Sequence, residues 1–443
     1  MNMTLESEIL KEVKPTPAQD KRVSALVEEL SEKVVDVSRK LGVHVEPMLV
    51  GSVAKGTHLK DPDIDLFMLF PESTPLDQLK EKGLEIGRKV VKGREHYAQH
   101  PYVRGTYKTF QVDLVPCFRI RDTRSKMSAV DRTPFHTEFV QKHLKKGEAD
   151  QVRLLKRFMK GIECYGAEAK VQGFSGYLCE LLIMRFGSFQ KTLEAASGWT
   201  VGQVLELPGY EGKEFSEPLT FVDPVDLTRN VASAVVPETL LRFVLASREY
   251  IAAPGRKFFF PAEREVWSAE ELRQRAGKRL ESLLSVTFAK LDLIDDVVYP
   301  QLRKSLVNIA ALLERADFEV EKTSIHVDGL THLLIELESM SLPNERKHRG
   351  PPVNSENVND FLSKWNSLGI SAPYVEGGKW YVMVKRQFKR ADDLLRSKMM
   401  DVPLGKNVKE QGGLEMNSGK ELLADEHLAA LTRHFDERMP WQR

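Results

Sequence analysis

The chain contains 443 residues, enough for two to four domains that each bury a sizeable core. Hydrophobic residues make up 42% and charged residues 29%, a balance typical of soluble globular proteins, and a formal net charge of +1 gives no overall field that would attract nucleic acid. No apolar run reaches the roughly 18 residues of a membrane-spanning helix, so we expect no membrane partner.

The N-terminal segment and the cysteines indicate a cytoplasmic protein. Residues 1–14 carry no apolar segment after a basic start, which a secretory signal would need. The three cysteines, Cys117, Cys164 and Cys179, are few, odd in number and without the spacing of metal ligands. We therefore expect reduced thiols and no zinc site.

The first predicted helix begins with the sequence Thr-Pro-Ala-Gln at residues 16–19. In this sequence threonine is the expected N-cap, proline takes the first helical position and glutamine closes a capping box. Apolar residues then recur at helical spacing from Val23 to Leu41, and Gly42 is the expected C-cap.

A short apolar run at residues 48–50 precedes Gly51 and Ser52, so we expect a strand, a glycine–serine turn and a short helix. Such a turn leaves backbone N–H groups and a hydroxyl pointing toward an anion, which suits a triphosphate. Lys55, one turn further on, adds a positive charge. A Gly-Ser pair alone carries almost no information, and a lone lysine is as often solvated.

Asp63 and Asp65 come directly before the apolar run Leu66–Phe70, and this run indicates a buried strand. Residues two apart in a strand point to one face, and like charges side by side on that face are unfavourable. A divalent cation relieves the repulsion, and Mg²⁺ is usually held by one or two carboxylates plus substrate phosphates. An Asp-x-Asp pair alone is more often a solvated strand end or a cap.

A helix is predicted for residues 76–91, and a strand for Tyr107–Cys117 that Pro116 ends. Asp113 is a lone carboxylate in that strand, and such a residue is more often a hydrogen-bonding side chain than a ligand. Brought beside the first two aspartates, it would complete a two-metal site for in-line phosphoryl displacement, or take the proton from the attacking hydroxyl. Only the ordered combination of turn, aspartate pair and later aspartate is specific, and it favours a nucleoside triphosphate site.

Beyond this segment the pattern becomes mostly helical, until an Ala-Pro-Gly sequence at residues 253–255 marks a boundary. Strands are then predicted at residues 284–290 and 380–384, and helices at residues 302–315 and 357–368. The chain is therefore predicted to be an α/β and α+β multidomain protein. Its three predicted domains are residues 1–137, 138–257 and 258–443.

Longer motifs extend the pattern along the chain. They are Gly51–Thr57, Asp63–Pro71, His100–Val103, Val112–Cys117, Ser128–His136, Val152–Lys156, Tyr165–Glu168, Gly173–Glu180, Asp223–Asp226, Arg229–Val231, Tyr299–Leu302 and Leu404–Val408. With these motifs the chain resembles the archaeal-type (class I) CCA-adding enzymes, which are tRNA nucleotidyltransferases of the polymerase-β-like superfamily. The resemblance covers essentially the whole chain, and several motifs are specific to that family rather than to the superfamily.

The resemblance implies a polymerase-β-like nucleotidyltransferase head, a helical neck that recognises the nucleotide base, and an α/β body and tail. It implies two Mg²⁺ ions, with metal ligands at Asp63, Asp65 and Asp113. It also implies nucleotide-binding roles for Gly51, Ser52, Lys55, His136, Lys156, Tyr165 and Arg229. The last of these would contribute to reading the base. The family often has arginine where this chain has Lys55, and lysine keeps the charge but loses the bidentate fork.

From the residues alone, the auxiliary positions stay open. A lone histidine such as His136 is more often structural, and Lys156 lies in a basic run that is usually a solvated face. Tyr165, between a cysteine and a glycine, is more often a core residue. Arg229, in a predicted loop after Asp226, could simply pair with that carboxylate.

Two basic clusters, Arg346–Arg349 and the stretch 379–390, lie near aromatic residues. Basic residues bind phosphates and aromatic rings pack on sugars or bases, although a solvated face over core aromatics is the commoner arrangement. The resemblance implies that the body and tail grip the acceptor half of tRNA by its shape and phosphates. The sequence leaves open whether the chain forms a homodimer.

The predicted function is template-independent addition of C, C and A to the 3′ end of tRNA. The 3′-hydroxyl would attack the α-phosphate of CTP or ATP, and pyrophosphate would leave. One alternative is a poly(A) polymerase-like enzyme, which would add many adenylates. Another is a non-catalytic tRNA-binding protein on the same fold, which would need no metal. A small-molecule nucleotidyltransferase would have no use for the basic C-terminal half.

Overall fold

The computed structural model describes residues 4–97, 101–122, 128 and 130–443. Residues 1–3 of the N-terminal segment, His100 of the His100–Val103 motif and Ala129 of the Ser128–His136 motif therefore lie outside the described residues. Contacts within the chain divide it into two units, which are Met1–Glu263 with Arg438–Arg443, and Arg264–Glu437. The predicted head, neck and body boundaries at 137 and 257 stay predictions.

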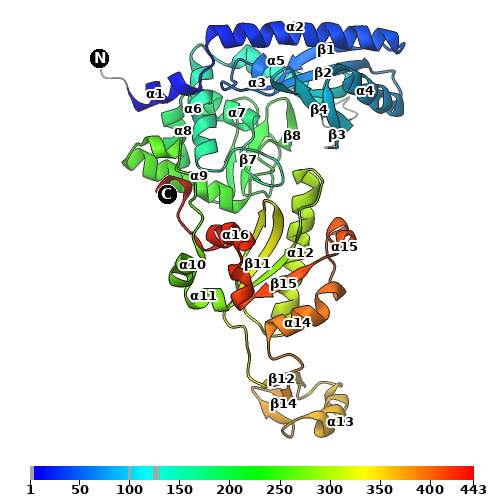
Figure 1. Ribbon diagram of the computed structural model, residues 1–443, viewed down its shortest axis with the longest axis vertical. Helices are drawn as coiled ribbons and strands as arrows, with labels where there is room; N and C mark the ends of the chain where they lie inside the picture. The colour runs from blue at the N-terminus through cyan, green and yellow to red at the C-terminus, as the bar shows by residue number, and fades with distance from the viewer. Residues whose placement is uncertain (1–3, 98–100, 123–127, 129) are drawn as a thin grey trace. The chain divides into compact units, whose positions relative to one another are not determined.

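A five-stranded sheet lies in the first unit (Figure 1), and its strands contain two of the three predicted aspartates. Its strands, in spatial order, are β1 (Glu46–Val50), β2 (Ile64–Pro71), β5 (Phe110–Arg119), β4 (Pro101–Tyr107) and β3 (Lys92–Tyr97). β2 and β5 run parallel, and the other neighbours run antiparallel. Helices α2 (Pro17–Lys40) and α4 (Leu76–Val90) pack apolar side chains against one face, which leaves the opposite face for Asp65 and Asp113.

The predicted start of the first long helix is confirmed. The side-chain oxygen of Thr16 accepts from the Gln19 backbone N–H at 3.3 Å, and the Gln19 side chain accepts from the Thr16 N–H at 2.9 Å. Helix α2 ends at the C-cap Leu41, and the next residue, Gly42, has a φ of +69°. Glycine adopts this left-handed conformation without strain. Gly42, the predicted C-cap, therefore lies one residue beyond the actual C-cap, where it turns the chain out of the helix.

The predicted strand Tyr107–Cys117 is wrong at both ends. Tyr107 ends β4, and the chain reverses at Lys108, whose φ is +53°, before β5 begins. β5 then continues through Pro116 to Arg119. Since β4 pairs with β5 only as far as Leu114, the missing N–H of proline removes no hydrogen bond to β4.

The rest of the first unit is largely helical and surrounds a core rich in phenylalanine. Its longer helices are α1 (Leu5–Val13), α5 (Thr133–His143), α6 (Glu148–Gly161), α7 (Gly176–Phe186), α8 (Phe189–Ala196) and α9 (Pro237–Ala252). The helical prediction missed a small sheet formed by β6 (Gln203–Leu205), β7 (Leu219–Asp223) and β8 (Asp226–Asn230). Strands of three to five residues are too short to show a clear alternation in the sequence.

The last residues of the chain return to the first unit. Trp441 is buried, its ring is stacked on Phe258 with 5.5 Å between centroids, and its Nε1 donates to Glu249 at 2.6 Å. Arg443 forms an ion pair with Glu163 at 3.0 Å. The second unit is therefore inserted, in sequence, between two parts of the first.

The second unit contains two sheets. The larger one has the order β10 (Val320–Val327), β11 (Leu330–Leu337), β9 (Leu283–Ala289) and β15 (Glu415–Ser418). The smaller one has the order β12 (Glu345–Pro352), β14 (Lys379–Lys385) and β13 (Tyr374–Glu376). The accompanying helices are α10 (Ala269–Ala276), α11 (Lys278–Glu281), α12 (Asp295–Arg315), α13 (Val358–Leu368), α14 (Ala391–Lys398), α15 (Lys406–Gln411) and α16 (Asp425–Phe435). The predicted strands and helices of this region are confirmed, except that α12 begins before residue 302.

Two motifs from distant parts of the sequence meet in the second unit. Gln301 of α12 donates to the Asn407 side-chain oxygen at 2.9 Å and accepts from the Asn407 backbone N–H at 2.8 Å. A Cβ on Gly405 would lie only 2.5 Å from the Cβ of Gln301, so this close approach requires glycine.

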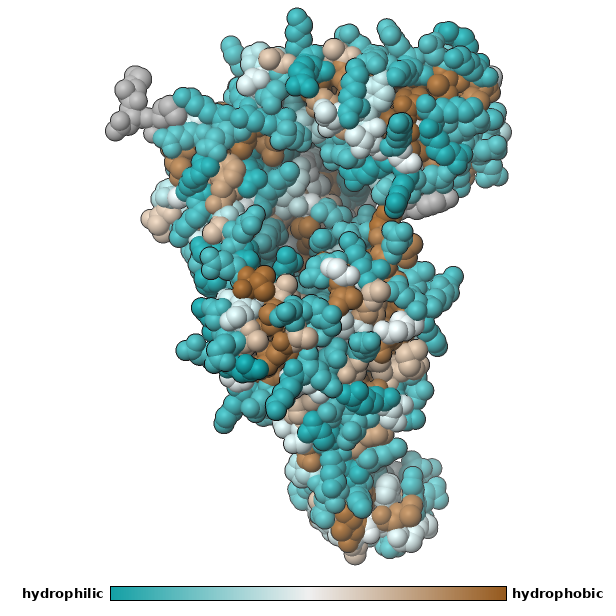
Figure 2. All heavy atoms as spheres, viewed as in Figure 1, coloured by the Kyte–Doolittle hydropathy of each residue, from teal (hydrophilic) through white to brown (hydrophobic). Residues whose placement is uncertain are grey.

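The surface and the thiols agree with the composition. Figure 2 shows hydrophilic side chains over most of the visible face, with apolar side chains in scattered patches. Among the helices that the structure describes, none is long and apolar enough to cross a membrane. Cys117, Cys164 and Cys179 are buried free thiols.

Candidate functional site

Neighbouring strands place two of the predicted aspartates side by side with an arginine. Asp65 of β2 lies directly opposite Asp113 of β5, and Asp113 lies directly opposite Arg104 of β4. Asp63 stands just before β2, and its Oδ2 lies 3.0 Å from Nη2 of Arg104. The fold therefore brings together the three carboxylates that the sequence singled out, and adds a cation.

Burial and mutual repulsion make Asp65 and Asp113 hard to ionise. Burial, together with the negative charges of Asp113 and Asp63, raises the pKa of Asp65 to about 7. Burial also raises the pKa of Asp113 to about 6, although the neighbouring Arg104 opposes the rise. Carboxylates that lie close together and are partly buried are stabilised in their ionised form by a nearby cation.

Arg104 supplies positive charge to two of the three aspartates. Its Nε lies 2.9 Å from Asp113 Oδ1, while its Nη2 contacts Asp63. The sequence indicated no role for Arg104, because the strand β4 was not predicted. Once that strand is known, the register of Arg104 opposite Asp113 is the signal that identifies it.

The chemistry of this cluster fits a divalent cation. Carboxylate oxygens are the hard ligands that Mg²⁺ prefers, and three carboxylates exceed the charge of one arginine. In residues 4–97, 101–122, 128 and 130–443, no three acidic, histidine or cysteine side chains are already arranged to hold an ion. Arg104 contacts one oxygen of Asp63 and one oxygen of Asp113. The metal-ligand roles of Asp63, Asp65 and Asp113 stay predictions.

Gly51 makes room for the aspartate cluster. It begins the one-turn helix α3 (Gly51–Ala54) with a φ of +70°, and a Cβ at this position would lie 2.0 Å from Asp65 Oδ2. A side chain here would therefore collide with the carboxylate as well as strain the backbone. Ser52 lies within the same turn and Lys55 directly follows it, so the predicted triphosphate segment adjoins the cluster.

Lys55 and Lys156 share one buried carboxylate, Glu180 of α7. Lys55 Nζ lies 2.8 Å from Glu180 Oε2, and Lys156 Nζ lies 3.1 Å from Glu180 Oε1. The hydroxyl of Thr57 donates to Glu180 at 2.5 Å. Although burial alone would raise the pKa of Glu180, the two lysines lower it to about 2. The solvated position considered for Lys156 is wrong, because its side chain is only 2% exposed.

Sequence analysis missed the role of Glu180. The residue lies inside a helix whose neighbouring residues, from Leu178 to Ile183, are otherwise apolar or cysteine. A single charged side chain in such a segment is the signal that could have identified it, because a buried charge needs a partner.

Helix α6 also holds the segment that joins α3 to β2. Arg153 donates from Nη2 to the Gly56 carbonyl at 2.6 Å and from Nε to the His58 carbonyl at 2.9 Å. Lys156, one turn further along the helix, donates to the Thr57 hydroxyl at 3.0 Å. The position of Lys55 and its neighbours is therefore fixed from the helical part of the unit.

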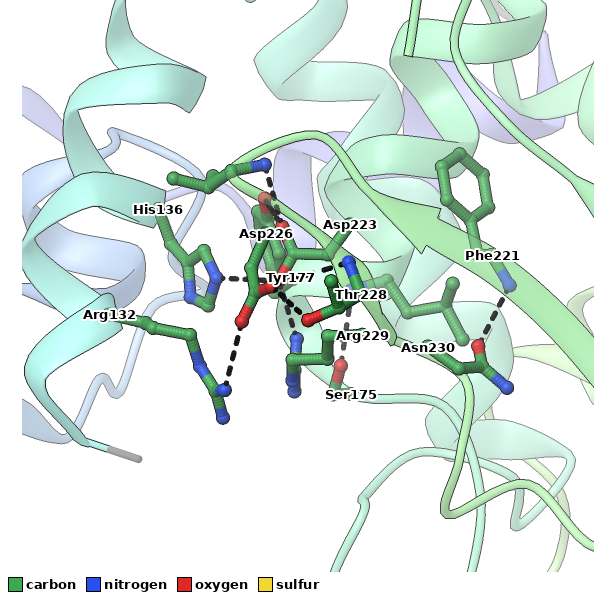
Figure 3. A network of polar contacts seen from close by, with 12 residues as sticks. Arg132, His136, Ser175, Tyr177, Phe221, Asp223, Asp226, Thr228, Arg229 and Asn230 are labelled. Carbon is green, nitrogen blue, oxygen red and sulfur yellow. Dashed lines mark hydrogen bonds and ion pairs between the residues drawn. The ribbon is translucent and has the colours of Figure 1, made fainter. Parts of the chain in front are cut away.

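A second polar network centres on the fully buried carboxylate of Asp223, at the end of β7 (Figure 3). Its Oδ2 lies 2.9 Å from His136 Nε2 and 2.9 Å from Arg229 Nη1, and its Oδ1 accepts from the Tyr177 hydroxyl at 3.2 Å. The His136 ring stacks on Tyr177 with 4.2 Å between centroids. Burial lowers the pKa of His136 even though Asp223 opposes the shift.

The alternative that Arg229 simply pairs with Asp226 is wrong. Arg229 lies on β8 rather than in a loop, and its guanidinium contacts Asp223 across the β7–β8 hairpin. Asp226 instead contacts Arg132, with 3.3 Å between Oδ2 and Nη1 (Figure 3). The sequence did not show this because it did not predict the hairpin.

Tyr165 lies close to the lysine–glutamate network. It forms an isolated β-bridge with Phe174. A Cβ on Gly176 would lie 3.0 Å from the Tyr165 hydroxyl and 3.5 Å from Lys156 Cε, so the tyrosine and the lysine approach the same glycine. Burial raises the pKa of Tyr165 well above its ordinary value, which keeps the hydroxyl protonated.

Known proteins resemble this chain over nearly its whole length. Residues 27–136 match the nucleotidyltransferase domain, residues 150–260 the second domain of tRNA nucleotidyltransferase, and residues 279–419 the C-terminal domain of CCA-adding enzyme. The CCA-adding enzyme of Methanosarcina acetivorans is 40% identical over 436 residues, which cover 96% of this chain and 95% of that protein. That of Methanothermobacter thermautotrophicus is 37% identical and covers 98% of both chains. A solved Cid1 poly(U) polymerase has a TM-score of 0.46 at 16% identity, covering 56% of this chain and 94% of that one.

Glu180→Gln should strongly destabilise the first unit, because two buried lysines would keep their charges without a carboxylate. We expect the free energy of unfolding to fall by about 3–5 kcal/mol, measured by urea denaturation. Glu12→Gln is the matched control, since Glu12 pairs with Arg256 on the surface of the same unit and should change stability little. Equal losses in the two variants would contradict a structural role for the buried network.

Asp65→Asn should stabilise the metal-free protein at high pH. The folded-state pKa of about 7 exceeds the ordinary 3.8, so the folded state loses stability as pH rises between these values and the buried carboxylate ionises. Asparagine removes that cost, so in EDTA the melting temperature should rise by a few degrees at about pH 8 and less at about pH 5. Asp61→Asn, at a nearby exposed residue, should show no such gain. The same gain at both pH values would exclude ionisation as the cause.

Proposed function

Because the chain belongs to the family of CCA-adding enzymes, we propose that it adds C, C and A, without a template, to the 3′ end of tRNA. CTP and ATP are the proposed donors, and pyrophosphate is the proposed leaving group. The observation that best supports transfer at the aspartate cluster is the register of β2 and β5, which sets Asp65 opposite Asp113.

In the proposed reaction the 3′-hydroxyl of tRNA attacks the α-phosphorus of the bound nucleotide. The new phosphodiester bond forms as the bond to pyrophosphate breaks. Asp63, Asp65 and Asp113 would hold Mg²⁺, two ions in our proposal, and the ions would neutralise charge on the attacking and leaving oxygens. We assign Asp113 as the acceptor of the hydroxyl proton, since the parallel pairing of β2 and β5 sets its carboxylate beside Asp65 at the proposed reaction centre.

The triphosphate is proposed to bind at the segment from Gly51 to Lys55. Two lysines share the single carboxylate of Glu180, so this network keeps one net positive charge for a polyanion. Ser52 adds a hydroxyl, and the N–H groups of the one-turn helix α3 have no partners within the helix. Since Glu180 already orients Lys55 and Lys156, nucleotide binding would cost little further side-chain entropy.

The network around Asp223 is proposed to recognise the base, with Arg229 as the main contact. Asp223 holds His136 and Arg229 in place, while the Arg229 side chain remains 29% exposed and can reach a ligand. Fixed donors and acceptors discriminate between bases because a mismatched edge leaves buried polar groups unpaired. Tyr165, beside Lys156, is proposed to contact the same nucleotide.

The second unit is proposed to grip the acceptor half of tRNA. On its smaller sheet Lys347 Nζ lies 4.2 Å from the ring centroid of Tyr381, and Tyr381 stacks on Tyr374 with 6.0 Å between centroids. Lys347 also forms an ion pair with Glu376 at 2.6 Å, and Arg386 forms one with Asp317 at 2.5 Å. Cations beside aromatic rings suit phosphates and sugars, and so a grip by shape rather than by base sequence.

Incubation with tRNA that lacks all or part of its terminal C-C-A should yield ordered addition of C, C and A, and then a stop. CTP and ATP would be supplied separately and together, and a chelator should abolish incorporation. Asp113→Asn should lower the rate by at least about 10²-fold with the fold intact by circular dichroism. Asp61→Asn, at an exposed aspartate just before the cluster, is the control and should retain activity.

The same measurement separates the alternatives. Long adenylate tails would indicate a poly(A) polymerase-like enzyme. Binding of tRNA without incorporation would indicate a non-catalytic binding protein. Full activity of Asp113→Asn would exclude the aspartate cluster as the reaction site.

Gly51→Ala should lower incorporation by at least about 10²-fold, because its Cβ would push the Asp65 carboxylate out of place. Gly56→Ala is a matched control. Gly56 also has a positive φ, +66°, but a Cβ there would meet no atom within 4 Å. The control therefore carries only the backbone strain of about 1–2 kcal/mol and should stay active. Equal activities of the two variants would show that the collision with Asp65 is unimportant.

A further inference from the structure

Arg104 is the residue near the proposed reaction centre that the proposed chemistry does not use. Its guanidinium contacts Asp113 through Nε at 2.9 Å and Asp63 through Nη2 at 3.0 Å. We propose that Arg104 is a built-in counter-ion, which neutralises the aspartate cluster in the metal-free chain and competes with the divalent cation for the same carboxylates. This inference rests on the proposed function, since it concerns the same metal-binding residues.

The two ion pairs and a bound cation cannot use the same oxygens at full strength. Arg104 contacts Asp63 Oδ2 and Asp113 Oδ1, and these carboxylates are two of the three proposed metal ligands. A divalent ion on those oxygens would stand beside the guanidinium, and the two positive charges would repel each other. A cation that took both of these oxygens would therefore require Arg104 to leave at least one of its partners.

The register of the sheet favours the position of Arg104 over the carboxylates. On the β5 side, Asp113 lies directly opposite Arg104. On the β3 side, Arg94 lies directly opposite Arg104. Like charges directly opposite each other on neighbouring strands repel, so Arg94 disfavours a position of the guanidinium toward β3.

The side chain of Arg104 also has room to leave. It is 39% exposed, whereas that of Asp113 is 14% exposed. The arginine can therefore turn toward solvent without unfolding the sheet, while the carboxylates stay in place. An exposed flexible cation over half-buried carboxylates is an arrangement that exchanges readily, unlike the fully buried Lys156–Glu180 pair.

The proposal predicts opposite effects on two properties of the full-length chain. In Arg104→Gln, the affinity for Mn²⁺ without nucleotide should rise roughly fivefold or more, measured by electron paramagnetic resonance of free Mn²⁺. In EDTA the same variant should melt a few degrees lower than the wild type, because the carboxylates lose their counter-ion. A residue that only supported the sheet, or that oriented the metal ligands, would weaken both properties together.

Arg119→Gln is the matched control, because it removes the same charge from an exposed arginine of the same sheet that pairs with Glu46 at 2.7 Å. It should leave Mn²⁺ affinity within about twofold of the wild type. Arg104→Lys keeps the charge but not the two-pronged contact, so its Mn²⁺ affinity should lie between those of the wild type and Arg104→Gln. That variant also tests the proposal if Arg104→Gln folds poorly.

Failure of the proposal and failure of the proposed function give different results. If the wild type binds Mn²⁺ and extends tRNA, but Arg104→Gln binds Mn²⁺ no more tightly, the counter-ion role is overturned and the proposed function stands. If Arg104→Gln binds Mn²⁺ more tightly than the wild type but neither protein extends tRNA, the counter-ion role stands and the proposed function is overturned.

Discussion

Three carboxylates, two on neighbouring strands and one directly before a strand, must be balanced by positive charge, and much of the first unit is arranged around that requirement. The parallel pairing of β2 and β5 fixes Asp65 opposite Asp113, so the backbone itself holds the repelling groups together. Gly51 has no side chain, which lets the β1–α3 turn approach Asp65 closely. Arg104 then places a cation at the far side of Asp113. The sheet thus supplies both the negative charge of the aspartates and, in Arg104, a positive charge that a metal ion can replace.

The helical part of the first unit extends the same principle to a second set of charges. Lys156 and Glu180 come from α6 and α7, whereas Lys55 and Thr57 come from the segment between α3 and β2. Their ion pairs therefore join the sheet to the helices while orienting two lysines. Because breaking a buried pair costs far more than breaking a surface one, these contacts also keep the segment in one conformation. The ammonium groups of Lys55 and Lys156 therefore support the structure, and the same groups are proposed to bind phosphate.

Local signals made much of this predictable from the sequence. The Thr16–Gln19 capping box and the aspartate pattern each lie within a few residues, and family matches confirm the predicted nucleotidyltransferase head. The missed features depend on contacts between distant residues or on weak local signals. The hairpin between β4 and β5 turns at Lys108, although lysine rarely adopts positive φ and no glycine or asparagine marks the turn. Because this hairpin was not predicted, the position of Arg104 opposite Asp113 was not predicted either.

The small sheet of β6, β7 and β8 was missed because its strands are short, and with it the true partner of Arg229 was missed. Glu180 shows a different limit. A helix rich in leucine gives no indication of which lysines will meet its one glutamate, since those lysines lie 24 and 125 residues away. The spacing of residues in the sequence identifies side chains that share one helix or strand. It does not identify the distant side chains of opposite charge with which they form ion pairs.

The return of residues 438–443 to the first unit has a consequence for how the chain is made. Trp441 completes the stack on Phe258, yet all of the second unit is synthesised between these two residues. Domains generally fold as they leave the ribosome, N-terminal part first. The first unit must therefore wait for its last core side chain until the second unit has been translated. A nascent chain stalled within the second unit would have the aspartate cluster in sequence, but not the finished core on which the surrounding helices pack.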